Sequence, residues 1–278
     1  MSSMLKLSTI ALLLGSLLNA NVEDIKVVDF LQKSFSKNPN IVKMDISIAD
    51  KSKVEAMAGW DAYIVKIIAT VKTSEGEKDI VQKMVYFSNG EYITQDLVNL
   101  NTNESLKESV TPTFKDSFYS KANLIYGDVN AKHKVAIFSD PLCPYCGTFV
   151  PEAIEYMKKE PKKFAIYYYH FPLVSLHPAS VVLTKAAIAA ELKGHKNSVL
   201  ELYKVKVNPR ETNVDVILKA FNQTLKTKIT PADVASAEVT KHFDFGINAA
   251  DEMMVQGTPS VFFDGKVDKT KTMYKKVK

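Results

Sequence analysis

The chain has 278 residues, of which 46% are hydrophobic and 24% charged, a composition that is ordinary for a globular protein and argues against extensive disorder. Its length allows one large domain or two smaller ones. The net charge is +5, but the lysines are spread among acidic residues rather than gathered into a patch, so nucleic-acid binding is not predicted.

The first residues, 1–20, are typical of a secretory signal peptide. Lys6 supplies a positive charge, residues 7–18 are mostly apolar, and Ala20 is a small residue at which cleavage would leave Asn21 as the mature start. The apolar run is shorter than the roughly 20 residues that span a membrane, although an uncleaved anchor is an alternative. The sequence therefore predicts export to a compartment where disulfides form and persist.

Residues 21–100 are predicted to form a small α+β domain with an antiparallel sheet. Apolar residues at helical spacing predict a helix over 22–35. Asn89 and Gly90 form a hairpin signal, since both residue types tolerate a positive φ. β-Branched and aromatic residues predict the strands, which are expected over 41–48, 60–71 and 80–87.

A polar segment over 101–121 is predicted to be a linker with a short helix in 105–110 or 115–120. Residues 122–278 are predicted to form an α/β domain, with a run of helices over 179–251. Short apolar runs predict strands, and apolar residues at helical spacing predict helices. The expected strands cover 134–138, 164–169 and 261–263, and the expected helices cover 145–160, 179–192, 213–225 and 231–254.

The only two cysteines are Cys143 and Cys146. A bridge between them closes a loop of about 4 residues, which stabilises a fold by roughly 1.9 kcal/mol, against about 4.7 kcal/mol for a 100-residue loop. A structural zinc site needs four ligands, and the five histidines show no short metal-ligand spacing. We therefore expect a redox-active pair with no metal and no added cofactor, and regard an inert bridge as the weaker alternative.

The surrounding residues support redox chemistry. A strand ending near residue 138 is followed by Pro144, which suits the first turn of a helix. Cys143 is then at the positive end of the helix dipole, where a thiolate is favoured. Cys143 is the expected nucleophile, and Cys146, one turn further along, is the expected resolving thiol that releases a mixed disulfide.

The order of strand, Cys143-Pro-Tyr-Cys146 and helix resembles the active site of thioredoxin-fold oxidoreductases. A second motif over 257–263, Gly-Thr-Pro-Ser-Val-Phe-Phe, is similar to the family's cis-proline loop, with Pro259 as the cis-proline. In the family this loop holds a substrate chain beside the nucleophile. The resemblance implies a thioredoxin-like catalytic domain in which Thr258 and Pro259 bind substrate.

The branch of the family remains open between two enzyme classes. Thr258 before the cis-proline, and Pro144-Tyr145 between the cysteines, resemble disulfide isomerases of the DsbC and DsbG type, and imply that Pro144 and Tyr145 also bind substrate. Residues 86–100 are similar to part of the isomerases' dimerisation domain. The insertion over 179–251, however, is of the size seen in DsbA-type oxidases.

The resemblance implies a periplasmic isomerase or reductase, with a DsbA-type dithiol oxidase as the alternative and a chaperone-like binding protein as the second. Its implied partners are misoxidised or unfolded exported proteins, a second copy in a homodimer built through residues 21–100, and a membrane redox partner. That redox partner would be a DsbD-like reductant or a DsbB-like oxidant.

Asp140 has two possible roles. Members of the superfamily often place an acidic residue beneath the buried cysteine for proton transfer, so Asp140 is a candidate proton relay. A surface turn with Pro141 is the alternative. Tyr167, Tyr168 and Tyr169 are interpreted as strand and core residues rather than as a ligand cage.

Overall fold

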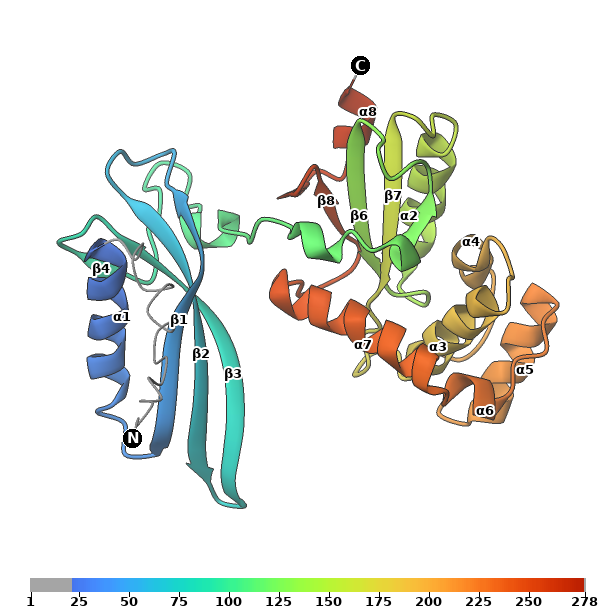
Figure 1. Cartoon of the computed structure of the whole chain (residues 1–278), viewed down its shortest axis with the longest axis horizontal. Coiled ribbons are helices and arrows are strands. Elements are labelled where there is room, and N and C mark those ends of the chain that lie inside the picture. The colour runs from blue at the N-terminus through green and yellow to red at the C-terminus, as the bar shows by residue number, and fades with distance from the viewer. Residues whose placement is uncertain (1–21, 278) are drawn as a thin grey trace, which may run out of the picture. The chain divides into compact units, whose positions relative to one another are not determined.

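The computed structural model describes residues 22–277, so the predicted signal peptide lies outside the described residues. The chain divides into two compact units, the first ending at Val110 and the second beginning at Thr111 (Figure 1). The segment over 101–121, predicted as a linker, is shared between them. Among helices of the described part, none is both long and apolar enough to cross a membrane.

The first unit is a helix packed on one face of an antiparallel sheet. Helix α1 (Val22–Phe35) has the predicted bounds and buries Val27 and Leu31 against the sheet. The strands extend beyond their predicted limits because the ladder continues through exposed polar residues up to the pair Thr73 and Gly76. In spatial order they are β1 (Ile41–Lys53), β2 (Asp61–Thr73), β3 (Gly76–Ser88) and β4 (Ile93–Thr94).

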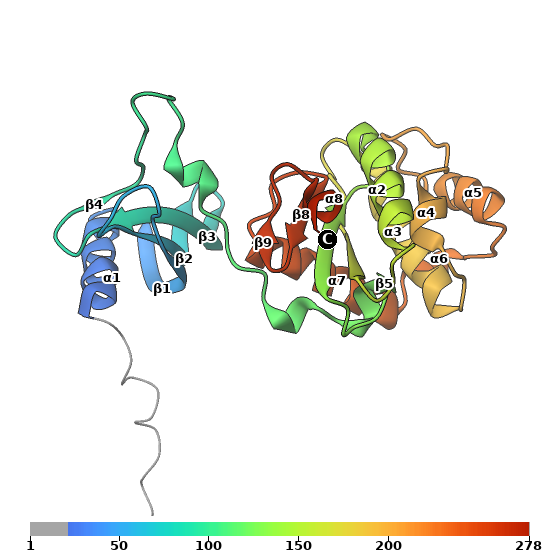
Figure 2. The ribbon, with the colours of Figure 1, turned by 90° about the horizontal axis from the view of Figure 1, so that it is seen from above.

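The second unit is built on a mixed sheet (Figures 1 and 2). Its two central strands, β6 and β7, run parallel and are the most deeply buried. The remaining neighbours pair antiparallel. In spatial order the strands are β5 (Leu124–Tyr126), β7 (Phe164–His170), β6 (His133–Ser139), β8 (Ser260–Phe263) and β9 (Lys266–Val267).

Helices cover both faces of this sheet. Helix α2 (Pro144–Met157) packs its apolar side on one face, together with the short C-terminal helix α8 (Met273–Lys276). Helix α7 (Ala237–Glu252) and the segment containing Phe114 and Phe118 cover the other face. Because side chains alternate along a strand, each of β6 and β7 contributes to both cores. The unit therefore has a thioredoxin-like fold of mixed α/β content.

The helical insertion has its own apolar core. The prediction of one helix over 231–254 is wrong, because the chain breaks between α6 (Pro231–Val234) and α7. Ser236 starts the new helix as its N-cap and accepts a hydrogen bond from the Val239 backbone. The insertion consists of α3 (Ala179–Leu192), α4 (Ser198–Leu202), α5 (Val214–Leu225), α6 (Pro231–Val234) and α7.

Three short elements and the region around residue 110 differ from what the sequence predicts. Strand β5 and helices α4 and α8 are too short to show a period and were not predicted. The helix predicted in 105–110 or 115–120 takes the form of single 3₁₀ turns, at Leu106–Ser109 and Asp116–Phe118.

Gly127, directly after β5, is a position that only glycine fits. Its φ is +88°, and a Cβ built on it would lie 1.9 Å from the Phe164 carbonyl oxygen. We expect Gly127→Ala to destabilise the protein by about 3 kcal/mol or more, because a positive φ and a backbone clash add together. Urea unfolding measures the loss.

The matched control is Gly147→Ala within α2, where an added Cβ meets nothing within 4 Å. Alanine is favoured over glycine in a helix by roughly 0.5–1 kcal/mol, so this control is expected to be neutral or slightly stabilising. Equal midpoints for the two variants would contradict the account of Gly127.

Candidate active site

The two cysteines lie where the buried strand β6 passes into helix α2. The strand ends at Ser139, and Cys143 is the N-cap residue of the helix, with Pro144 at its first position. Proline costs nothing there because its missing N–H would have no partner within the helix. The Cys143 carbonyl accepts from the Gly147 N–H at 3.0 Å, which closes the first turn and brings Cys146 onto the same side as Cys143.

Both cysteines are free thiols with little solvent contact. Cys143 is 6% exposed and Cys146 is fully buried beneath it. The Cys143 thiol donates to the Thr258 carbonyl at 3.6 Å. This arrangement allows the Cys143 sulfur to react with a substrate first. The buried Cys146 sulfur can then act only on the resulting mixed disulfide.

The loop that holds Thr258 is brought to the cysteines by the sheet. Strand β8 pairs antiparallel with β6, with Ser260 opposite Phe138, so the residues just before β8 lie beside the end of β6. The peptide bond between Thr258 and Pro259 is cis, as the resemblance to the cis-proline loop implies. Thr258 and Pro259 are thus next to Cys143 although they follow it by more than a hundred positions.

Burial governs the chemistry of Cys146 and raises the pKa of its thiol to about 11. Three uncharged donors partly offset this effect: the hydroxyls of Ser139 and Thr258, and the backbone N–H of Asp140. The Thr258 hydroxyl is buried and makes no hydrogen bond in this structure. A Cys146 thiolate would therefore be met by neutral dipoles rather than by a cation.

Asp140 is completely buried, so the predicted alternative of a surface turn is wrong. Its carboxylate accepts from the Leu142 N–H at 2.7 Å, the Leu173 N–H at 2.7 Å and the Ser180 hydroxyl at 2.6 Å. His177 Nδ1 lies 3.0 Å from the same carboxylate. These contacts join the loop before Cys143 to the start of helix α3.

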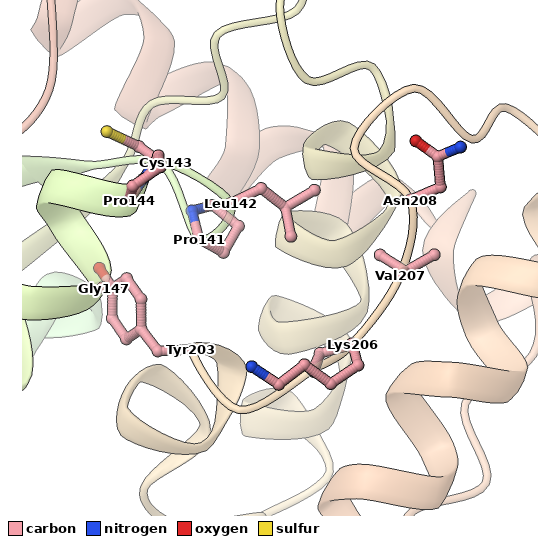
Figure 3. Close-up of a pocket in the computed structure, with 10 residues that line it drawn as sticks. Pro141, Leu142, Cys143, Pro144, Gly147, Tyr203, Lys206, Val207 and Asn208 are labelled. Carbon is pink, nitrogen blue, oxygen red and sulfur yellow. The ribbon is translucent and has the colours of Figure 1, made fainter.

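Two grooves flank Cys143. One, of about 580 Å³, runs from Cys143 and Pro144 to a wall that includes Lys206, Val207 and Asn208 (Figure 3). The other, of about 710 Å³, is lined by Tyr145, Phe149, Thr258, Pro259 and Tyr274, among others. Each predicted substrate-binding residue thus lines a groove beside the nucleophile, and Tyr145 is 79% exposed there.

With this geometry, comparison with protein families gives a direct result. The family model described as thioredoxin matches residues 119–278, more than half of the chain. The chain belongs to the thioredoxin family. Among curated proteins, none matches this sequence.

Solved structures similar to this thioredoxin-family protein come from several bacteria. A thioredoxin-like oxidoreductase from Silicibacter pomeroyi is 21% identical, with a TM-score of 0.43, over 54% of this chain and 84% of that one. A periplasmic thioredoxin-like protein from Salmonella enterica is 20% identical, with a TM-score of 0.44, over 55% and 87%. BdbD from Bacillus subtilis is 16% identical, with a TM-score of 0.46, over 60% and 92%.

Sequence reasoning missed two parts of the site. Ser139 and Tyr203 were not singled out, although both lie near Cys146. Lys206 and Asn208, in the groove wall, come from the segment after the unpredicted helix α4. No local pattern marks these residues, because their proximity to the cysteines depends on how the helical insertion folds back.

Proposed function

We propose that this thioredoxin-family protein is an exported thiol–disulfide oxidoreductase that mainly rearranges wrong disulfides in other exported proteins. The observation that carries the proposal is that Cys143, Cys146 and the Thr258 carbonyl come together at the start of helix α2, just beneath the surface. This arrangement offers a nucleophile, a hidden second thiol and a backbone acceptor for a bound chain. The pair Cys143–Cys146 is the redox group, and no added cofactor is proposed.

The reaction is thiol–disulfide exchange. The Cys143 thiolate attacks one sulfur of a substrate disulfide, forming a mixed disulfide and releasing the other substrate sulfur as a thiolate. In isomerisation, a substrate thiolate then attacks the mixed disulfide, regenerates Cys143 and leaves a new pairing in the substrate. In reduction, the Cys146 thiolate attacks Cys143, the Cys143–Cys146 disulfide forms, and the substrate leaves with two more electrons.

The substrate is proposed to lie across the two grooves, with its backbone beside Thr258 and Pro259. Pro144 and Tyr145 would contact the chain from the first turn of α2, where both are exposed. Asp140 remains a candidate proton relay, but its carboxylate is occupied by donors from α3 and the loop after β7. We therefore give it a positioning role in preference to a relay.

The second candidate function is a net dithiol oxidase of the DsbA type. The observation that favours it is the helical insertion, since the segment after α4 supplies one wall of the groove at Cys143. An oxidase keeps Cys143 and Cys146 as a disulfide and passes that disulfide to reduced substrates. Thr258 before the cis-proline, and the resemblance of 86–100 to the dimerisation domain of isomerases, favour isomerisation.

We place the protein in the periplasm, on the basis of the predicted signal peptide at 1–20. A homodimer built through residues 21–100 would form a cleft for misfolded chains and keep the cysteines from an oxidising partner. A DsbD-like membrane reductant would then hold the pair reduced, whereas a DsbB-like partner would serve an oxidase. A monomeric mass in solution would count against the dimer.

The test compares two assays on one preparation of the full mature chain. In the first, a small secreted enzyme with scrambled disulfides is reactivated under a mild thiol buffer. In the second, the same enzyme is supplied fully reduced and its oxidation is followed. Cys143→Ser, which removes the proposed nucleophile, is the control for both assays.

The isomerase proposal expects rescue of the scrambled enzyme that disappears in Cys143→Ser. Fast oxidation with little rescue would transfer the proposal to the oxidase. Activity in neither assay, or equal activity in Cys143→Ser, would overturn thiol–disulfide chemistry at this site.

A further inference from the structure

A chain of three hydroxyl groups lies next to the buried thiol. The Ser139 hydroxyl is 2.7 Å from that of Tyr203, and the Tyr203 hydroxyl is 2.8 Å from that of Tyr168. The Ser139 hydroxyl is also one of the hydrogen-bonding groups that lower the pKa of the Cys146 thiol. The four side chains come from separate elements: the end of β6, the residue after α4, strand β7 and helix α2.

The chain can direct its protons toward Cys146. In each of the two pairs either oxygen can be the donor, so the hydroxyls can reorient when the charge on the sulfur changes. Burial raises the pKa of Tyr168 and of Tyr203 far above neutrality, so both stay protonated and remain donors. Linked hydrogen bonds of this kind polarise one another and strengthen donation at the charged end.

A charged group does not fill this role. The donors that act on Cys146 are hydroxyls and one backbone N–H, and the Asp140 carboxylate is held by donors of its own. Burying a thiolate without compensation is costly, and hydrogen bonds to a charge are among the strongest available in a protein interior. Donors to the Cys146 sulfur should therefore matter most in the step in which that sulfur is anionic.

We propose that Tyr203 and Tyr168 are positioning residues that act through the Ser139 hydroxyl to stabilise the Cys146 thiolate during resolution of the mixed disulfide. The inference rests on the proposed thiol–disulfide chemistry. In the step concerned, the Cys146 thiolate attacks Cys143, the Cys143–Cys146 bond forms, and the sulfur bound to Cys143 leaves as a thiolate with the electron pair of the broken bond. The proton that Cys146 loses goes to solvent.

The test uses the reduced full mature chain and the aromatic disulfide dithiobis(nitrobenzoic acid). Attack by Cys143 releases one coloured thiolate, and attack by Cys146 on the resulting adduct releases a second, so one absorbance trace reports both steps. We expect Tyr203→Phe to lower the ratio of the second rate to the first by about tenfold, the size expected for weakening one hydrogen bond to a charge. Tyr168→Phe, one link further away, should lower it less.

A double variant and a control variant distinguish this positioning role from a general loss of structure. The double variant Tyr203→Phe/Tyr168→Phe should fall no further than Tyr203→Phe alone, because the Tyr168 hydroxyl is hydrogen-bonded to the Tyr203 hydroxyl. Tyr167→Phe is the matched control. Tyr167 is on the same strand as Tyr168 but faces the other side of the sheet, and its buried hydroxyl has no hydrogen-bond partner. Its ratio should equal that of the unmodified protein.

The pH profile of the second phase is also diagnostic. The titratable groups around Cys146 are Cys143, which is blocked in the adduct, together with Tyr168 and Tyr203; the pair of Asp140 and His177 holds the preceding loop. Because burial raises the pKa of Cys146 to about 11, the rate should rise tenfold per pH unit between about pH 6 and pH 9. In Tyr203→Phe the profile should move by about one unit to higher pH.

Equal ratios and superimposed pH profiles for Tyr203→Phe, Tyr168→Phe and Tyr167→Phe would overturn the inference while leaving the proposed function intact. Absence of a second phase in the unmodified protein would overturn both. Rescue of scrambled substrate by the unmodified protein, measured as above, shows independently whether the function itself holds.

Discussion

Replacing Cys146 by serine is expected to stall the protein as a covalent adduct with its substrate. Cys143 remains at the helix N-terminus with its carbonyl acceptor at Thr258, so the first attack still takes place. A serine hydroxyl cannot displace the substrate sulfur, and the adduct can leave only by attack from another thiol. Reductase turnover should fall by about 10³-fold or more, the scale seen when an essential nucleophile is removed.

The adduct is measured by mass spectrometry after incubation with a disulfide-bonded peptide and acid quenching. We expect the protein mass to increase by the mass of the attached peptide chain. Addition of a reductant should release the peptide and restore the original mass. Cys143→Ser serves as the control and should form no adduct, because Cys146 is fully buried. An adduct on Cys146 in that control would show that the roles of the two thiols had been assigned in the wrong order.

Asp140→Ala is expected to be among the most destabilising single substitutions in the chain. The side chain is fully buried, and removing it leaves the Leu142 and Leu173 N–H groups, the Ser180 hydroxyl and the His177 ring without their acceptor. Removing one member of a buried charged network typically costs about 3–5 kcal/mol. Since domains are stable by only about 5–15 kcal/mol, much of the native stability would be lost.

Urea unfolding at neutral pH measures this effect. The matched control is Asp116→Ala, an aspartate whose side chain is 96% exposed and 3.9 Å from Lys134, which should change the midpoint little. Asp140→Asn keeps the shape of the side chain and one acceptor oxygen, so its unfolding midpoint should lie between those of Asp140→Ala and Asp116→Ala. A midpoint for Asp140→Ala equal to that of Asp116→Ala would mean that water replaces the carboxylate.

The parts of the site that lie close together in sequence could be predicted. The strand, Cys143, Pro144 and Cys146 follow one another, and the fold of such a segment depends on local rules such as proline at the start of a helix. The cis peptide bond before Pro259 was also predictable, because its loop leads into a recognisable strand. Even there, the match depended on resemblance to a family rather than on spacing.

The parts that meet only through the tertiary fold could not be predicted. Tyr168 was correctly expected in the core, but its hydroxyl contacts Tyr203, which lies 35 positions further along the chain. The sequence around Asp140 indicated neither the burial of this side chain nor its hydrogen-bond partners. Those partners lie in the loop after β7 and at the start of α3. Side-chain direction at the end of a strand depends on such neighbours, and the sequence alone leaves it open.

The contacts of Asp140 also bear on whether this active site can be transplanted. A loop whose buried carboxylate bonds only to itself could be moved into another scaffold as a short cassette. Here three of the four partners, Leu173, His177 and Ser180, belong to a different stretch of the chain. The smallest segment that could be transplanted is therefore the cysteine loop together with residues 173–180. A chimaera that carries only the cysteine loop would bury the Asp140 carboxylate with one of its four partners, the Leu142 N–H.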